Sequence, residues 1–388
     1  MPEQLTPLQI MQKLVSFPTV SRDTNLPLID WVENYLSDHG IKAHRYYHEE
    51  GEKAALFAHT GPWEEGAVVL SGHTDVVPID GQPWDSNPFE VVEKDGKYFG
   101  RGTCDMKGYD ALAIWALVAA SKQSLKRPLQ LALSFDEEVG CTGAPPMIEA
   151  MQPILPKGSA VIVGEPSNMQ AVTAHKGGQG YVVHITGFEV HSSLLPTGVS
   201  AILEAGRVLE WVNRTNAEIQ AKKPETLAGM FTPPFTTLHV GNINGGTARN
   251  ITAKSCVLDF EMRVVPGEDP SDWDAKFVTE IRRIEANMRK IHPDTGIELE
   301  TLFGVPGLRP EQNGEAEALA RAITGDNGTH VVSYGTEGGQ FQAAGYSTVV
   351  CGPGSINQAH QPNEFIEISE FEAGHDFMKT LITRLEES

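Results

Sequence analysis

The chain has 388 residues, with 40% hydrophobic and 21% charged side chains, a composition typical of globular proteins. This length exceeds that of a single ordinary core and predicts two or three domains. Acidic residues outnumber basic ones by 51 to 30, giving a formal net charge of −21. Such a balance argues against a nucleic-acid-binding protein, which needs a basic face, and against docking on an anionic membrane.

Targeting signals and paired cysteines are not visible in the sequence. Residues 1–15 lack the basic and apolar regions of a signal peptide. The longest apolar run, 111–120, is about half of the ~20 residues that a membrane-spanning helix needs. The four cysteines lie far apart and form no CxxC pair. We therefore expect a cytoplasmic protein with reduced thiols, in which any metal site uses histidine, aspartate and glutamate.

Two helices are predicted at the start of the chain. Thr6 is a favourable N-cap, and Pro7 suits the first helical position, where no backbone N–H is needed. A second amphipathic helix is predicted from about 27 to 39, and Gly40 suits its C-terminal stop.

Short apolar runs follow, and these predict buried strands. The runs lie at residues 67–70, 129–135 and 160–163. A helix is predicted between the first two, at about 108–122. Buried strands that alternate with helices predict an α/β domain with a largely parallel sheet flanked by helices.

From about residue 178 the predicted order changes to strand, helix, strand, strand, helix, strand. These elements are predicted at 181–186, 200–213, 237–242, 257–264, 272–290 and 297–302. A βαββαβ order predicts a small open, ferredoxin-like sheet with two helices on one face. We expect this unit to be inserted at 178–304 into a domain formed by 1–177 and 305–388.

Acidic and histidine residues follow several predicted strands, at the strand ends where open α/β sheets bind ligands. His73 and Asp75 come just after the strand at 67–70 and, two residues apart in extended chain, point to one side. A carboxylate is the usual partner for the second ring nitrogen of a metal-binding histidine. The alternative is a capped strand end with a surface histidine.

Two single carboxylates are further candidates. The glycine-rich stretch 100–108 delivers Asp105 to the start of a predicted helix, although an aspartate there is commonly only an N-cap. Its glycines lack the spacing of a dinucleotide-binding fingerprint. Glu165 ends the strand at 160–163 and is held by Pro166, so it is another candidate ligand.

Three consecutive acids, Asp136, Glu137 and Glu138, follow the strand at 129–135. Like-charge repulsion there requires a nearby cation or a raised pKa, unless the segment is a solvated turn. Adjacent strand residues point opposite ways, which predicts different roles for Glu137 and Glu138. His360 comes later, beyond the predicted strand at 347–351.

Together these segments supply two histidines and three carboxylates, with one glutamate left over. That set suits a pair of zinc-like ions that share a carboxylate, with the remaining glutamate as general base.

Five motifs in this order resemble those of the dinuclear zinc aminoacylase and carboxypeptidase family. They are SGHTDVVP at 71–78, GRGTCDMKG at 100–108, DEEVG at 136–140, GEPS at 164–167 and QAHQPNE at 358–364. The segments at 335–341 and 351–360 resemble those of the acetylornithine deacetylase members of the family.

The resemblance implies a metal site with divided roles. His73 and Glu165 would bind one zinc ion, Glu138 and His360 the other, and Asp105 would bridge both. Cobalt suits the same ligands as zinc.

The resemblance also implies that Asp75 orients His73 and that Glu137 is the general acid and base. A cis peptide bond would follow Asp105. The inserted unit would be a lid and dimerisation domain whose His191 reaches the active site of the partner subunit of a homodimer. The lead-in to this histidine, Phe188-Glu189-Val190, departs from the usual family pattern.

The expected reaction is hydrolysis of the acetyl amide of N2-acetyl-L-ornithine to L-ornithine and acetate, by a water held between two metal ions and activated by Glu137. Arg263 and Asn250 are expected to bind the substrate, Arg263 through its α-carboxylate, unless Arg263 only pairs with Glu261 on the strand surface. Glu337 is expected to pair with the ornithine ammonium.

The alternative functions are those of another N-acyl-amino-acid deacylase, such as a succinyl-diaminopimelate desuccinylase, or of a dipeptidase. A non-catalytic relative would lack ligands, and all five are present.

Overall fold

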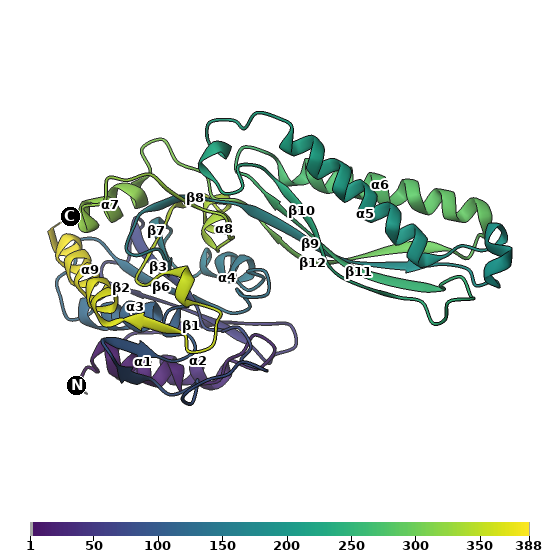
Figure 1. Cartoon of the computed structure of the whole chain (residues 1–388). Helices are drawn as coiled ribbons and strands as arrows, with labels where there is room; N and C mark the ends of the chain where they lie inside the picture. Colours follow the sequence, from purple (N-terminus) through teal and green to yellow (C-terminus); the bar gives the residue numbers. More distant parts are fainter. Residues whose placement is uncertain (1–2, 388) are drawn as a thin grey trace. The chain divides into compact units, whose positions relative to one another are not determined.

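The computed structural model describes residues 3–387, and the chain divides into two compact units (Figure 1). The first unit contains the chain up to Ala174, Leu308–His330 and the chain from Thr336. The second contains His175–Gly307 and Val331–Gly335. The last of these segments lies outside the insertion that we expected at 178–304.

The first unit begins with the two predicted helices. α1 spans Pro7–Val15, and the hydroxyl of Thr6 accepts a hydrogen bond from the backbone N–H of Gln9 at 3.2 Å. The side chain of Gln9 accepts one from the backbone N–H of Thr6 in return, which completes a capping box. α2 spans Leu26–Asp38. Both helices bury their apolar stripes in the core of this unit.

An eight-stranded sheet forms the centre of the first unit, in the order β1-β2-β6-β3-β7-β14-β8-β13. Its strands are β1 (Ala43–Tyr47), β2 (Ala54–Thr60), β3 (Ala67–His73), β6 (Leu129–Ser134), β7 (Gly158–Pro166), β8 (Val172–His175), β13 (His330–Val332) and β14 (Ser347–Gly352). β6, β3, β7 and β14 are parallel, while β1 and β2 extend the sheet in antiparallel fashion. The predicted largely parallel α/β sheet is therefore confirmed.

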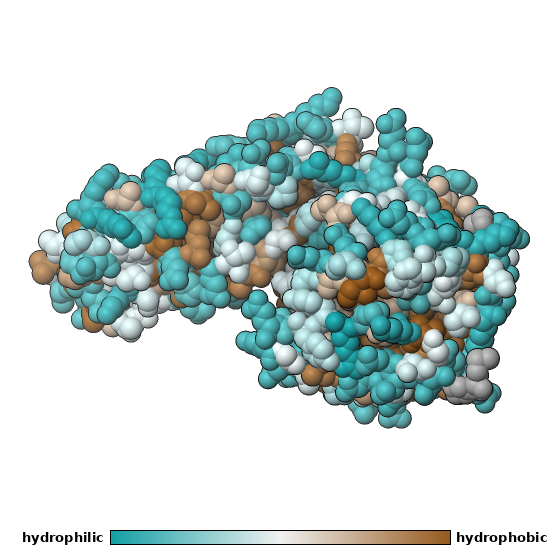
Figure 2. Space-filling view, turned by 180° about the vertical axis from the view of Figure 1, so that it is seen from behind, coloured by the Kyte–Doolittle hydropathy of each residue, from teal (hydrophilic) through white to brown (hydrophobic). Residues whose placement is uncertain are grey.

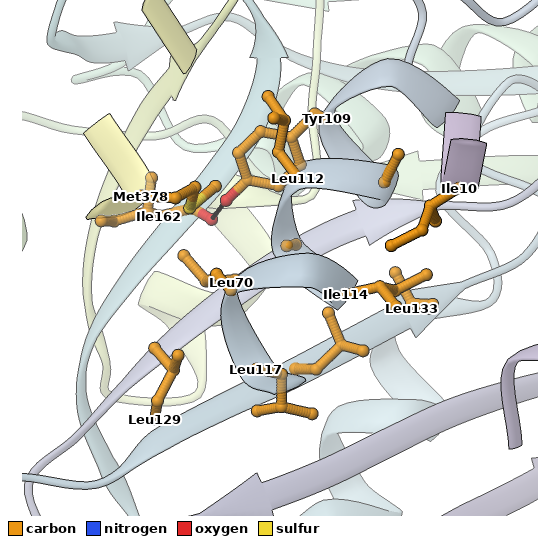
Figure 3. Packing of buried hydrophobic residues seen from close by; sticks show 14 of the residues in the cluster. Ile10, Leu70, Tyr109, Leu112, Ile114, Leu117, Leu129, Leu133, Ile162 and Met378 are labelled. Atoms are coloured by element: carbon orange, nitrogen blue, oxygen red, sulfur yellow. Dashed lines mark hydrogen bonds between the residues drawn. The ribbon is translucent and has the colours of Figure 1, made fainter. Parts of the chain in front are cut away.

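Helices cover the central strands, which are buried along nearly their whole length. α3 (Lys107–Ala120) is apolar on almost every side, as expected of a helix enclosed by a core. Leu112 of α3 belongs to one buried cluster with Leu70 of β3, and the hydroxyl of Tyr109 donates to the carbonyl oxygen of Ile162 at 3.0 Å (Figure 3).

The remaining helices of the first unit are α4 (Ala144–Met151), α7 (Glu315–Thr324), α8 (Gly338–Ala343) and α9 (Ile368–Glu387). α9 contacts α3 on the side of the main core, and α4 and α8 contact β6 and β7. A separate three-stranded sheet, β15-β5-β4, is formed by β4 (Val92–Lys94), β5 (Lys97–Phe99) and β15 (Phe365–Glu367).

The second unit has the predicted βαββαβ order, with longer elements than expected. They are β9 (Gly177–Thr186), α5 (Ala201–Gln220), β10 (Thr237–Gly245), β11 (Ser255–Val264), α6 (Pro270–Ile291) and β12 (Gly296–Val305). The strands form an antiparallel sheet in the order β10-β11-β9-β12, and both helices lie on one face of it (Figure 1). Phe260 of β11 stacks on Phe277 of α6 inside this core, with ring centroids 3.9 Å apart.

Hydrophilic residues predominate on the face drawn in Figure 2, as the charged composition leads one to expect. Among residues 3–387, no helix has the length and apolarity that crossing a bilayer requires.

Candidate metal and catalytic site

The candidate ligands meet at one edge of the large sheet. His73 is the last residue of β3, Glu165 lies near the end of β7, and Glu137 and Glu138 lie three and four residues beyond the end of β6. These three strands are parallel neighbours, so their carboxyl ends lie together.

Asp105 lies between the two histidines. Its loop ends at the start of α3, and the peptide bond from Asp105 to Met106 is cis, as the resemblance implied. One carboxylate oxygen is 3.1 Å from Nε2 of His73, and the other is 3.1 Å from Nε2 of His360. A carboxylate with one oxygen directed at each histidine is suited to bridging two cations.

Each histidine also faces a second carboxylate. Nε2 of His360 is 3.0 Å from an oxygen of Glu138, and Nε2 of His73 is 3.7 Å from an oxygen of Glu165. The structure thus brings together the five side chains that the sequence suggested as ligands. Within residues 3–387, two groups have donor atoms close enough to hold an ion, namely His73–Glu137–Glu165 and His73–Asp105–Glu138.

Asp75 fixes both the histidine and the acidic loop. Nδ1 of His73 is 3.0 Å from the backbone carbonyl oxygen of Asp75, so Nδ1 donates and Nε2 faces the other ligands. The carboxylate of Asp75 accepts hydrogen bonds from the backbone N–H groups of Glu137 and Glu138, at 3.1 and 3.3 Å. It also accepts one from the hydroxyl of Ser21, a residue that no sequence motif indicated.

Burial and crowding of carboxylates shift the pKa values of the site. Desolvation, with neighbouring carboxylates, raises the pKa of Glu137 to about 8 and that of Glu138 to about 7, and it raises the pKa of Glu165 as well. Burial alone would raise the pKa of Asp105, but hydrogen bonds from His360 and His73 outweigh it and hold that pKa well below its usual value. The hydrogen bonds that His360 donates to the carboxylates of Asp105 and Glu138 raise the pKa of this histidine to about 10.

These residues fit a pair of divalent cations. One oxygen of Glu138 and one of Glu165 are buried without a hydrogen-bond partner among the described residues. Buried carboxylates are stabilised by pairing or by coordinating a metal. A set of two imidazoles and three carboxylates provides nitrogen and oxygen ligands of the kind that zinc and similar transition metals accept.

The acidic run has the cation that like-charge repulsion required. Nζ of Lys53 lies 2.6 Å from a carboxylate oxygen of Asp136 and also donates to the carbonyl oxygen of Ser21. Sequence alone could not locate this lysine, because it precedes the acidic run by 83 residues.

Glu337 is close to the site but buried beneath it. Its carboxylate accepts hydrogen bonds from the hydroxyls of Ser71, at 3.2 Å, and Ser134, and the residue is only 1% exposed. Burial raises its pKa to about 7. Both oxygens thus already accept hydrogen bonds from serine hydroxyls. This arrangement does not favour the expected pairing of Glu337 with an ornithine ammonium.

The remaining candidate residues lie in the second unit. Arg263 of β11 pairs with Glu261 at 3.1 Å, which is the surface pairing that the sequence left open. The backbone carbonyl of Asn250 accepts a hydrogen bond from the N–H of Ser192 at 2.9 Å. Asn250 and the loop of His191 are therefore adjacent within this unit.

His191 is exposed and has a defined tautomer. Its Nδ1 accepts a hydrogen bond from the backbone N–H of Ser193 at 3.3 Å and is 2.7 Å from the hydroxyl of the same serine. Because a backbone N–H can only donate, Nδ1 carries no hydrogen and Nε2 does. Nε2–H is consequently the donor that His191 has left for another partner.

The chain is similar to known proteins in both sequence and structure. The model of peptidase family M20/M25/M40 matches residues 69–384. Acetylornithine deacetylase from Myxococcus xanthus is 35% identical over 373 residues, which cover 93% of this chain and 92% of that protein. The structure of the M20 metallo-carboxypeptidase Sso-CP2 from Sulfolobus solfataricus matches with a TM-score of 0.79 at 16% identity, over all of both chains. That of Bacillus subtilis YXEP, described as a dinuclear metal-binding peptidase, matches with a TM-score of 0.65 at 14% identity, over 98% of both.

The family match and the acetylornithine deacetylase relative, together with the imidazoles and carboxylates at the sheet edge, show that this protein is a metal-dependent amidohydrolase. The chain belongs to peptidase family M20/M25/M40.

Proposed function

We propose that this protein hydrolyses N2-acetyl-L-ornithine to L-ornithine and acetate. The observation that carries the proposal is Asp105, whose two oxygens are directed at His73 and His360 in a hydrolase-family fold. The choice of substrate is supported by the Myxococcus xanthus relative, which is named acetylornithine deacetylase.

In this proposal two metal ions, zinc or cobalt, are held by the five residues at the sheet edge. Asp105 would be the ligand shared by both ions, His73 and Glu165 would hold one of them, and Glu138 and His360 would hold the other. Such ions, when bound, supply a water that is nucleophilic at neutral pH and an electrophile for the amide carbonyl.

Glu137 is the proposed general base and acid. It lies beside His73 and Glu165 but is left over once five ligands are assigned, and its backbone N–H is anchored by Asp75. It takes the proton from the attacking water and then gives it to the leaving amine of ornithine. Breaking the amide bond requires this second transfer, because an unprotonated amide nitrogen is a poor leaving group.

The second unit is proposed to contribute the substrate contacts. Nε2–H of His191 is available to donate to the oxygen that becomes negative during attack. Arg263 suits the substrate α-carboxylate, since a guanidinium can bind it through two hydrogen bonds. Asn250, next to the His191 loop, is a further contact. We propose that the protein is a homodimer, joined through this unit, in which His191 serves the partner's site.

One comparative assay tests the substrate. Zinc- or cobalt-loaded protein is offered N2-acetyl-L-ornithine, N-succinyl-diaminopimelate and a dipeptide, and bound metal is measured on the same sample. We expect kcat/KM to be highest for acetylornithine, with two metal ions per chain. A clear preference for another substrate at full metal content would reject the acetylornithine assignment and leave the metal site intact.

A further inference from the structure

A buried ion pair links the chain segments that bear two of the proposed ligands. We propose that Arg101 and Glu364 are positioning residues that hold Asp105 and His360 at the distance that a metal pair requires. The inference rests on the metal site of the proposed function but not on its substrate.

The carboxylate of Glu364 organises the loop of the bridging ligand. One of its oxygens accepts hydrogen bonds from three backbone N–H groups, those of Gly102, Cys104 and Asp105, each at 3.0 Å. Its other oxygen accepts a hydrogen bond from Nη1 of Arg101 at 2.6 Å. The side chains of Arg101 and Glu364 are 0% and 1% exposed. A single carboxylate thereby fixes the path of the backbone that presents Asp105.

The same residue belongs to the segment of the other ligand. Glu364 follows His360 by four residues and directly precedes β15, which pairs with β5 through Phe365 and Phe99. The backbone N–H of Gly100 donates to the carbonyl oxygen of Glu364 at 2.9 Å. Both the backbone and the side chain of Glu364 therefore bind the loop after β5 to the loop before β15.

Arg101 extends this connection to His360 itself. Its Nη2 donates to the side-chain oxygen of Gln82 at 2.6 Å, and the amide nitrogen of Gln82 donates to the backbone carbonyl of His360 at 3.2 Å. The ring of Trp84 lies 5.1 Å from the guanidinium carbon. All of these groups belong to the first unit.

The backbone of His360 needs such support. Its φ is +62°, in the left-handed region that residues other than glycine rarely adopt. A conformation of this kind persists only where the surrounding structure imposes it. At His360 the contact to the backbone carbonyl comes from Gln82, which Arg101 holds in turn.

A purely structural role for the pair makes a different prediction. Altering one partner of a buried ion pair leaves the other charge without its partner, which lowers the stability of the whole domain. The hydrogen bonds of this pair instead go to the two ligand loops. Changes behind the ligands of a metal site typically weaken metal binding by about 10–100-fold. Metal affinity, measured separately from fold stability, therefore distinguishes the two roles.

The experiment compares Glu364→Gln and Arg101→Lys with a control at an ion pair far from the site. In Glu364→Gln an amide N–H₂ group would face the guanidinium, and in Arg101→Lys the fork that holds Gln82 is lost. The control is Arg127→Lys, whose guanidinium pairs with Glu315 at 2.6 Å and donates to the carbonyl of Gly66. Residues 66 and 127 precede β3 and β6, so the control pair lies at the opposite end of the strands from the site.

Metal-free protein is titrated with Zn²⁺ by calorimetry, and thermal unfolding of the same samples is recorded. We expect one of the two zinc dissociation constants to rise about 10–100-fold in both variants, as it should in His360→Ala, while Arg127→Lys stays within about twofold of the wild type. Acetylornithine KM at saturating Zn²⁺ should be unchanged. Wild-type zinc affinity in folded Glu364→Gln and Arg101→Lys would overturn the proposal.

If those two variants fail to fold, Gln82→Ala tests whether the connection from Arg101 to His360 supports zinc binding. Gln82 is half-buried, and its removal breaks the contact between Arg101 and the carbonyl of His360, together with a hydrogen bond from Nε1 of Trp84. Both partners of the Arg101–Glu364 pair stay in place. A weakened zinc site is expected there too, and unchanged affinity would overturn the proposal. If the wild type binds two zinc ions but does not hydrolyse acetylornithine, the substrate assignment fails and this inference stands.

Discussion

The carboxylate of Asp75 accepts a hydrogen bond from the backbone N–H of Glu137, 3.1 Å away. Because the backbone carbonyl of the same aspartate binds Nδ1 of His73, one residue aligns both a proposed ligand and the proposed base. Asp75→Asn would place an amide N–H₂ where a carboxylate oxygen now accepts. We expect kcat to fall about 10–100-fold and one metal to bind more weakly, as is usual for partners of metal ligands. Steady-state kinetics with metal analysis checks this, and unchanged values of both would remove Asp75 from the site.

Removing the proposed base should separate catalysis from metal binding. Glu137→Ala is expected to lower kcat by at least about 100-fold, the lower range for general base catalysis, with two metal ions retained. His360→Ala provides the contrast, because the loss of a ligand should lower metal occupancy. Metal content and kcat are measured on each variant. If Glu137→Ala loses metal while Glu138→Ala keeps it, the roles of these two glutamates are exchanged.

The assignment of Arg263 depends on whether a guanidinium is needed or only a positive charge. Arg263→Lys should lower kcat/KM for acetylornithine at least about tenfold, since lysine reproduces two-hydrogen-bond carboxylate binding poorly. Arg282→Lys is the control and should have no effect on kcat/KM, because Arg282 is an exposed arginine that pairs with Glu285 on α6. A change of less than about twofold in Arg263→Lys would mean that the arginine only pairs with Glu261 on the strand.

Glu337 tests a role that the sequence suggested and that the geometry constrains. The sequence-based prediction is that Glu337→Gln harms hydrolysis of acetylornithine more than that of acetylmethionine, which has no side-chain ammonium. In the structure both carboxylate oxygens already accept hydrogen bonds from Ser71 and Ser134, so a comparable loss on both substrates is what this geometry favours. The ratio of kcat/KM values for the two substrates decides between these outcomes, and a selective loss of about fivefold or more would establish Glu337 as the selecting residue.

The sequence predicted the central fold because its buried strands are continuous apolar runs. It predicted the candidate ligands because each follows such a run or a glycine-rich turn. β1 was not predicted, since the half-buried segment Ala43–Tyr47 has no clear alternation of polar and apolar residues. β2 was also not predicted, although its residues Ala54–Ala58 form a short buried apolar run. The Lys53–Asp136 and Arg101–Glu364 pairs were also not predicted, because they join residues 83 and 263 positions apart and no local pattern reports such contacts.

His191 provides the strongest test of the proposed dimer. Its Nε2–H is free to donate because Ser193 occupies Nδ1, and the loss of one oxyanion donor typically lowers kcat by about 10²–10³-fold. His191→Ala should show that loss with full metal content. If His191 serves the partner's site, mixing inactive His191→Ala subunits with inactive Glu137→Ala subunits should restore activity, because one site of a mixed dimer then has both wild-type residues. Differently tagged subunits show whether exchange has occurred. Exchange without recovered activity would mean that His191 acts within its own chain or has no part in catalysis.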